Sequence, residues 1–348
     1  MKKVAIITIW DLWNYGNRLQ NYAVTAIAKK KGLIPETVIY KNKNVLDYKT
    51  RMQYLIWSIL FKLSGGKKRV PEYRAKKFNE FTLKNIPFKK VDSISELSEY
   101  DYLMIGSDQI WNANIVTPTE FEYGYGVDPN RVICMSPSFG VEGFDAGTEE
   151  KISTLMKRME NISVREHSGA EIVKRLTGKS AQVFIDPTLM LDAEDWTRLE
   201  KKPSKIANKK YILKYFLGDE TQESLDDTAR INKNDEYEVI KFLNRNDIWS
   251  YVTGPAEFLY LIHHAEIILT DSFHACVFSI LFRRPFWAYS RTGEKMNSRL
   301  DTLFKLLELD NRFEHDKNHP FEIDYTKVDM ALSKERAKVN EYIDSIIK

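Results

Sequence analysis

Short apolar runs rich in β-branched residues recur along this chain, and stretches with the spacing of an amphipathic helix separate them. Runs of this kind are typical of strands that are buried on both faces of a parallel sheet. The first half holds six, which we expect to form one sheet: residues 4–9, 36–40, 101–106, 131–136, 161–164 and 181–185. The second half holds four more: residues 211–217, 237–243, 266–271 and 285–289. The pattern predicts an α/β fold with two Rossmann-like, doubly wound sheets.

The length of the chain favours two domains. At 348 residues it exceeds the size at which one hydrophobic core usually stops growing. The polar, basic segment 201–210 has the composition of an interdomain linker. We therefore expect domains over residues 1–200 and 211–325 that face each other across a cleft. A helical spacing of apolar residues predicts a closing helix over residues 326–348: Val328, Met330, Leu332, Val339, Tyr342, Ile343 and Ile346.

Charge and cysteine content exclude several classes of function. The 52 basic and 49 acidic residues nearly cancel, so we expect no nucleic-acid partner. Cys134 and Cys276 are the only cysteines, and both have apolar neighbours, which fits reduced cytosol better than a disulfide framework. The first apolar run ends at Asp11 without a small-residue cleavage site, and no run approaches the ~20 apolar residues of a spanning helix. We expect a cytoplasmic protein.

The loop after the first strand carries polar side chains where a helix begins. In parallel sheets, ligands bind at the carboxyl ends of strands. No strand is followed by a GxGxxG or GxxxxGK[ST] motif, which argues against a dehydrogenase or an ATPase. A Gly16 turn at a helix N-terminus, with amides and a guanidinium beside it, can hold an anion or sugar hydroxyls; ordinary capping is the alternative. The candidates are Asn14, Asn17, Arg18 and Gln20.

The loop after the strand at 101–106 has a composition suited to sugars. Ser107, Asp108 and Gln109 offer polar groups, with Asn112 close behind. Trp111 would supply a flat apolar face for the C–H groups of a pyranose ring. The alternative is a helix N-cap at the same position.

Two further strands end in charged residues. Arg165 follows the strand at 161–164, and a guanidinium at this position can grip a carboxylate or phosphate. A structural salt bridge with Glu166 or a nearby aspartate is the alternative. Asp186 follows the strand at 181–185, where it can cap, bind or form a turn, and a capping or turn role is favoured.

The strongest local signal surrounds His274. Asp271 and Ser272 can cap a helix directly after a buried strand, which places His274 in the first turn of that helix. A helix N-terminus attracts anions and lowers the pKa of a histidine until an anionic ligand raises it again. His274 is therefore placed to touch a phosphate or to pass a proton. A structural histidine is the alternative.

Metal and cofactor signatures are weak. His263 and His264 are adjacent, but the sequence near them shows no third ligand at a metal-like spacing. We assign no metal and expect no cofactor. No GxSxG motif is present, and neither cysteine lies in a pattern that indicates a nucleophile.

Six blocks, taken in order, resemble the motifs of the polysaccharide pyruvyl transferase family. They are NYGNRLQNYAV, IGSDQIWN, ISVRE, IDPTLML, TDSFHACVFSILFRRPF and SRLDTLFKLLEL, and they extend from residue 14 to about residue 309. The resemblance implies a glycosyltransferase-B-like pair of domains. It also implies a transferase that joins the enolpyruvyl group of phosphoenolpyruvate to two hydroxyls of a sugar in a cell-surface polysaccharide or its lipid-linked precursor.

The resemblance also implies roles for individual residues. Arg165 matches an arginine that grips the donor, and His274 matches the histidine of an Arg-x-His motif, so both become candidate catalytic residues. Ser272 stands where that motif has arginine. Arg299 and Arg18 are the candidates to supply the missing charge, and a related activated anion is the alternative donor. The loops after the first and third strands then become acceptor contacts, with the acceptor on the first domain and the donor on the second.

Two other classes of function remain open. A glycosyltransferase of the same fold would use a nucleotide sugar, whose diphosphate the helix start at His274 would serve equally well. A non-catalytic glycan-binding relative would explain Ser272. Phosphoenolpyruvate binding without a response to nucleotide sugars would favour the family reaction over a glycosyltransferase. Transfer activity would exclude a non-catalytic glycan-binding protein.

A short apolar helix suggests contact with a membrane. Within residues 48–69, the apolar run 54–63 is too short to span but has basic residues on both sides. Trp57 and Phe61 are four residues apart and would share a lipid-facing side. This predicts peripheral docking at the inner membrane face; a helix packed on the first sheet is the alternative.

Overall fold

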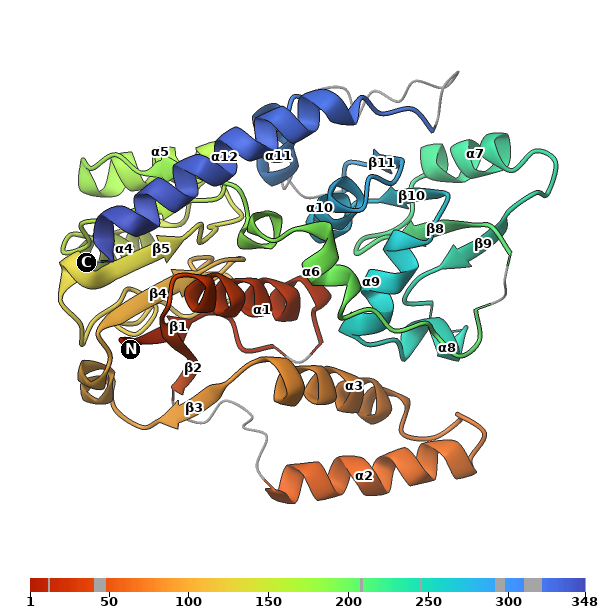
Figure 1. Cartoon of the computed structure of the whole chain (residues 1–348), viewed down its shortest axis with the longest axis horizontal. Coiled ribbons are helices and arrows are strands. Elements are labelled where there is room, and N and C mark those ends of the chain that lie inside the picture. Colours follow the sequence, from red (N-terminus) through yellow and green to blue (C-terminus); the bar gives the residue numbers. More distant parts are fainter. Residues whose placement is uncertain are drawn as a thin grey trace.

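A computed structural model of the chain describes residues 1–11, 13–40, 48–206, 209–244, 246–291, 298–309 and 321–347 (Figure 1). Within these residues the strands form a five-stranded sheet, a four-stranded sheet and a two-stranded sheet, and every strand pairing is parallel. The α/β class expected from the sequence is therefore confirmed.

The five-stranded sheet has the order β3-β2-β1-β4-β5. Its strands are β1 Lys3–Ile7, β2 Ile34–Tyr40, β3 Phe88–Val91, β4 Tyr102–Gly106 and β5 Val132–Met135. The central strand β1 pairs with β2 and β4, so that Val4 lies beside Pro35 on one side and Tyr102 on the other. Strands β4 and β5 are buried along their whole length, as expected for a sheet covered on both faces.

The first sheet differs from expectation in two ways. Strands β6 Ser163–Val164 and β7 Gln182–Val183 pair with each other and do not extend it. The cause lies at the edge of β5, where the Ser163 hydroxyl donates to the Cys134 carbonyl (2.6 Å) and the Cys134 amide donates to the Tyr342 hydroxyl (3.0 Å). Side chains thus replace a backbone ladder. The sequence also failed to indicate β3, a short edge strand with two lysines.

The four-stranded sheet has the order β11-β10-β8-β9. Its strands are β8 Tyr211–Tyr215, β9 Glu238–Lys241, β10 Ile267–Thr270 and β11 Phe286–Ala288. Strands β8, β10 and β11 are fully buried. The carboxyl end of β10 leads directly into a helix, which is the connection that positions His274.

Helices cover these sheets and join the two halves. The longer ones are α1 Tyr15–Lys30, α2 Tyr48–Leu63, α3 Val70–Asn85, α4 Ala146–Met156, α5 His167–Thr177, α7 Gln222–Ile231, α9 Pro255–His263, α10 Phe273–Leu281, α11 Ser298–Leu306 and α12 Tyr325–Ile346. Short turns of helix are η1 Ile94–Glu99, η2 Pro129–Arg131, η3 Pro187–Met190, α6 Ala193–Thr197 and α8 Ile248–Tyr251.

The two halves share one hydrophobic core. Tyr15 of α1 stacks on Phe258 of α9, with ring centroids 4.7 Å apart. Trp196 of α6 meets the edge of Phe278 of α10 at 4.9 Å. Because these contacts are apolar and buried, they hold the carboxyl end of β10 against the N-terminus of α1. The division into 1–200, 211–325 and 326–348 stays a prediction.

The closing helix predicted from the sequence is α12. It runs from the second half of the chain back to the first, where the C-terminus lies near β5 (Figure 1). The Arg336 guanidinium donates to the carbonyls of Leu189 and Leu191, and Tyr342 reaches β5. Met330 is 72% exposed, so its assignment to the apolar face was wrong.

Helix α2 lies at the outer edge of the molecule with α3 beside it (Figure 1). Of the aromatic pair expected to face lipid, Phe61 points the other way, since it stacks on Tyr73 of α3, and Trp57 is only partly exposed. Across the described part of the chain, none of the helices combines the length and the apolar character needed to cross a membrane.

Candidate functional site

The N-terminus of α1 forms one wall of the site. Asn14 caps the helix, because its side-chain oxygen accepts a hydrogen bond from the Asn17 amide at 3.2 Å. Gly16 was expected to form a turn, but it is the second residue of α1. A Cβ atom on Gly16 would lie 1.9 Å from Nδ1 of His274. The position therefore needs glycine because an imidazole from the other half lies against it.

The N-terminus of α10 forms the opposite wall. Strand β10 ends at Thr270, and the Ser272 side chain caps α10 by accepting from the Ala275 amide at 3.4 Å. Asp271 is held by the Leu217 and Gly218 amides at 2.7 and 2.9 Å. His274 lies in the first helical turn, as predicted.

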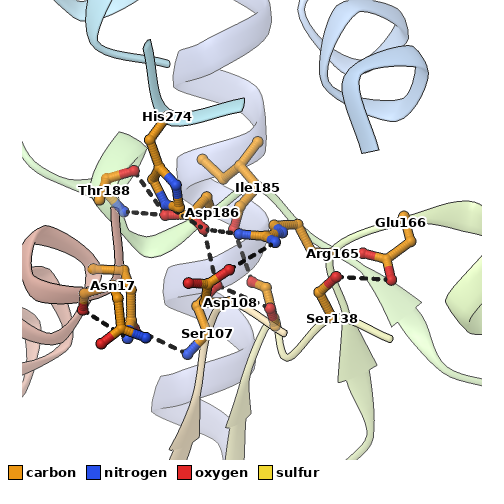
Figure 2. A network of polar contacts seen from close by, with 12 residues as sticks. Asn17, Ser107, Asp108, Ser138, Arg165, Glu166, Ile185, Asp186, Thr188 and His274 are labelled. Atoms are coloured by element: carbon orange, nitrogen blue, oxygen red, sulfur yellow. Dashed lines mark hydrogen bonds and ion pairs between the residues drawn. The ribbon is translucent and has the colours of Figure 1, made fainter. Parts of the chain in front are cut away.

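Three buried charged residues lie between these walls (Figure 2). Arg165 Nη1 donates to Asp186 Oδ2 at 2.8 Å, and Arg165 Nη2 lies 3.4 Å from Asp108 Oδ1. Ser107 donates to the same Asp186 oxygen at 2.9 Å, while the Thr188 amide and hydroxyl donate to the other. Asp186 is therefore the residue that joins the ends of β4, β6 and β7.

Asp186 also reaches the histidine. Its Oδ2 atom lies 3.8 Å from Nε2 of His274. That nitrogen is buried and has no hydrogen-bond partner among the described residues. The arrangement leaves one polar atom of His274 available to a ligand beside a carboxylate that can support its protonated form.

The charges in this cluster shift one another's pKa values. Burial alone would raise the pKa of Asp186, but a protonated His274, the Arg165 guanidinium and the hydrogen bonds from Thr188 bring it to about 2. Burial lowers the pKa of His274 below its usual range, although Asp186 and Asp108 oppose that shift. The free protein thus carries an ionised Asp186 and a neutral His274 at neutral pH.

Arg299 of α11 supplies the nearby cation. Helix α11 approaches α5, where the His167 amide donates to Thr302 at 3.2 Å. Burial lowers the pKa of Arg299 to about 10, and the neighbouring Arg165 acts in the same direction. Its charge lowers the pKa of Asp108 and His274, so it lies within electrostatic reach of both.

Arg18 points to a different place. Its Nη2 atom donates to the Ile9 carbonyl (2.9 Å) and to Asn17 (2.8 Å), and its guanidinium lies over the Trp10 ring. Burial lowers its pKa to about 10. Of the two arginines named from the sequence, Arg299 is the one whose charge acts on His274.

Several candidates from the sequence have structural roles instead. Arg165 is fully buried between two carboxylates, so it forms the salt bridge that was the alternative. Its direct grip on the donor stays a prediction. Trp111 is 1% exposed and stacks on Tyr123, which excludes it as a sugar platform. The Gln20 side-chain amide donates to the Thr8 hydroxyl, and its oxygen accepts from the Ser107 backbone amide.

The remaining acceptor candidates differ in their exposure and in their contacts. Asn14 is exposed, Asp108 borders the cluster with its backbone in the left-handed region (φ 57°), and Gln109 packs against Gly140. Asn17 is buried, where its oxygen accepts from Arg18.

Two residues of the site have a larger part than the sequence indicated. A capping or turn role was favoured for Asp186, and it does cap, but its contacts with Arg165 and His274 join segments far apart in sequence. Glu166 accepts from the Phe139 and Gly140 amides at 2.8 and 3.1 Å and so fixes the loop after β5. An acidic residue directly after a strand was the only available signal.

A separate cluster lies at the end of α9. Glu200 accepts from His263 at 2.6 Å and from His264 at 3.3 Å, which brings together three potential metal ligands. His264 is the C-cap residue, so the chain turns there and both imidazoles can face one carboxylate. The sequence could not show Glu200, which lies 63 residues before His263. The hydrogen bonds already satisfy the cluster, and we assign no metal to it.

Comparison with known proteins gives a family. The sequence model described as polysaccharide pyruvyl transferase matches residues 14–293, which include both walls of the site. No curated protein matches the sequence significantly.

Solved structures of sugar-active enzymes resemble the fold at low sequence identity. A glycosyltransferase from Rickettsia africae has 10% identity and a TM-score of 0.48, covering 100% of this chain and 99% of its own. The UDP-GlcNAc 2-epimerase of Neisseria meningitidis, bound to UDP-GlcNAc, has 12% identity and a TM-score of 0.45, covering 96% and 100%.

Proposed function

The chain belongs to the polysaccharide pyruvyl transferase family, and on that basis we propose that it transfers the pyruvyl group of phosphoenolpyruvate to two hydroxyls of one sugar. The acceptor is a cell-surface polysaccharide or its lipid-linked precursor. The observation that carries the proposal is the position of His274, at a helix N-terminus with an unpartnered ring nitrogen beside Asp186.

The donor phosphate is expected at the start of α10. A helix N-terminus presents backbone N–H groups and a positive dipole to an anion. His274 lies in that turn, and Arg299 acts on the same residues from α11. Arg299 is our candidate to replace the arginine that the family motif has at the position of Ser272. Arg165 then serves as a positioning residue that holds Asp186 and Asp108.

The chemistry needs one proton donor and two oriented hydroxyls. A proton delivered to C3 of phosphoenolpyruvate creates positive charge at C2, and the first sugar hydroxyl adds there. Phosphate leaves with the C–O electron pair, and the second hydroxyl closes the ketal. Of the two hydroxyl protons, one replaces the proton given to C3 and the other leaves with phosphate. We assign the acid to His274, whose pKa an arriving anion raises.

The acceptor sugar is assigned to the loops that face His274 from the first half of the chain. Asn14 and Gln109 offer amide groups, and Asp108 offers an ionised carboxylate. A carboxylate with a lowered pKa is a weak base but a good hydrogen-bond acceptor, so Asp108 is expected to orient an attacking hydroxyl.

Ligand-induced stabilisation tests the donor. We expect phosphoenolpyruvate to raise the unfolding temperature of the wild type, with a much smaller effect from pyruvate or inorganic phosphate alone. The His274→Asn variant should lose this response. Stabilisation by nucleotide sugars without a response to phosphoenolpyruvate would identify a glycosyltransferase instead.

A further inference from the structure

Helix α2 has two apolar faces, and only one is packed. On the inner face, Phe61 stacks on Tyr73 of α3 with centroids 4.0 Å apart and an interplanar angle of 7°. Beside it, Lys76 donates to the buried Ser58 hydroxyl at 3.2 Å. These contacts fix the rotation of α2, so its other side must face outward.

The outer face is a continuous apolar strip, which we call the α2 strip. Leu63 is 80% exposed, and the other members are 40–52% exposed: Met52, Leu55, Ile56, Ile59 and Leu60. At 100° per residue these six side chains occupy about 140° of the helix circumference. Single exposed apolar residues are common, but a contiguous patch of this kind marks an interaction surface.

Positive charge lies at one end of the strip. Lys62, Lys67 and Lys68 are exposed, and Arg69 follows them at the start of α3. Arg69 is partly engaged, since it pairs with Glu72 at 2.9 Å. The sequence from residue 48 to residue 71 contains no Asp or Glu. The surface therefore combines exposed apolar side chains with positive charge that no acidic residue in this segment offsets.

We propose that the α2 strip docks this protein onto an anionic lipid bilayer. Its apolar side chains would enter the acyl boundary while the lysines contact lipid phosphates, as in interfacial helices. The 16 residues of α2 are too few to span a bilayer, so the helix lies along the surface. A second copy of the chain would bring the same positive charges to the contact, whereas anionic lipid supplies the opposite charge.

A pocket of about 330 Å³ lies between α2 and the second half of the chain. Phe61 and Lys62 of α2 line it together with Trp249 and Thr253 of the second half. The Thr253 carbonyl accepts from the Tyr15 hydroxyl at 2.9 Å, and Tyr15 precedes the Gly16 that contacts His274. Docking through α2 would suit a sugar presented on a lipid, a step that rests on the proposed function; docking itself does not.

Vesicle cosedimentation of the whole chain tests the proposal. We expect binding to mixed phosphatidylglycerol–phosphatidylcholine vesicles at low salt, weakening as salt screens the charges. Replacing Lys62, Lys67 and Lys68 with Glu should weaken binding by roughly a hundredfold or more. The triple variant Leu55→Gln, Ile59→Gln, Leu63→Gln should also lose binding, with an unchanged circular dichroism spectrum because these positions are exposed.

The matched control changes the same net charge elsewhere. Lys151, Lys157 and Lys327 are exposed and lie on other helices or at their ends, and their replacement with Glu should leave vesicle binding close to wild type. Equal loss in both charge variants, or no binding at low salt, would overturn the proposal. A wild-type dimer that the three Gln substitutions convert to a monomer would also overturn it, because the strip would then be a subunit interface.

Discussion

Gly16 of α1 lies against the imidazole of His274, so that the first helix of the chain and the helix after β10 are in contact at this pair. The contact joins two segments 258 residues apart in a buried position, since 274 − 16 = 258. It fixes where Nε2 of His274 points, which is toward Asp186 (Figure 2).

Replacing Gly16 with Ala should displace His274. The added methyl group would overlap the ring, and an ångström-scale displacement of a catalytic group costs roughly a hundredfold in rate. Gly147→Ala is the matched control, because Gly147 also lies in the first turn of a helix and its nearest neighbour would be 3.4 Å from the new Cβ. Steady-state assays of both variants check this; equal activity would argue against a fixed histidine.

The Asp186→Asn variant should change the stability at acid pH. The pKa of Asp186 is held near 2 in the folded protein, below its ordinary value of 3.8. A depressed carboxyl pKa stabilises the fold above the unfolded pKa, and this contribution is lost as the pH falls from about 4 to 2. The shift corresponds to about 2 kcal/mol, so the variant should lose less stability over this range than the wild type. Urea unfolding at several pH values measures the difference, and parallel curves would contradict it.

Arg165→Ala should unfold the protein more readily rather than only impair donor binding. Removing the guanidinium leaves Asp186 and Asp108 buried without their partner, which costs about 3–5 kcal/mol. His274→Ala, which breaks no hydrogen bond of Nε2 among the described residues, should keep most of its stability. Denaturant unfolding compares the two. Equal stability of Arg165→Ala and the wild type would mean that the charge cluster is not structural.

Arg299 of α11 should strengthen the binding of phosphoenolpyruvate. Arg299→Ala is expected to weaken phosphoenolpyruvate binding roughly ten- to a hundredfold, because an interaction with a charged group is lost. In that background, Ser272→Arg should restore part of the affinity by supplying the arginine of the family motif. Isothermal titration of the four combinations measures this. Unchanged affinity in Arg299→Ala would exclude it as the replacement cation.

The sequence was sufficient for elements that local patterning determines. All ten apolar runs contain a strand, and Ser272 caps the helix that carries His274. Strand β3 was not predicted, because an edge strand tolerates lysines that weaken the apolar pattern. Strand β6 was assigned to the wrong sheet, because Tyr342, far along the chain, occupies the edge of β5. Local pattern cannot reveal a partner of that kind.

The site shows the same division. His274 could be placed at a helix start from its neighbours alone, but the roles of Arg165 and Asp186 depend on each other, and 21 residues separate them. Helix α2 is a further case. Its apolar residues lie on more than one side of the helix, so periodicity could not decide that Phe61 faces α3 and Leu63 faces outward.

Acceptor-dependent release of phosphate from phosphoenolpyruvate tests the central claim most directly. With lipid-linked sugars from cell-surface polysaccharide synthesis as acceptors, the wild type should release one phosphate for each sugar that gains a pyruvyl ketal, detected by mass spectrometry. The His274→Asn variant should be slower by roughly a hundredfold or more, the usual cost of losing a positioned acid. Equal rates in the variant, or a glycosyl group in place of the ketal, would contradict the account.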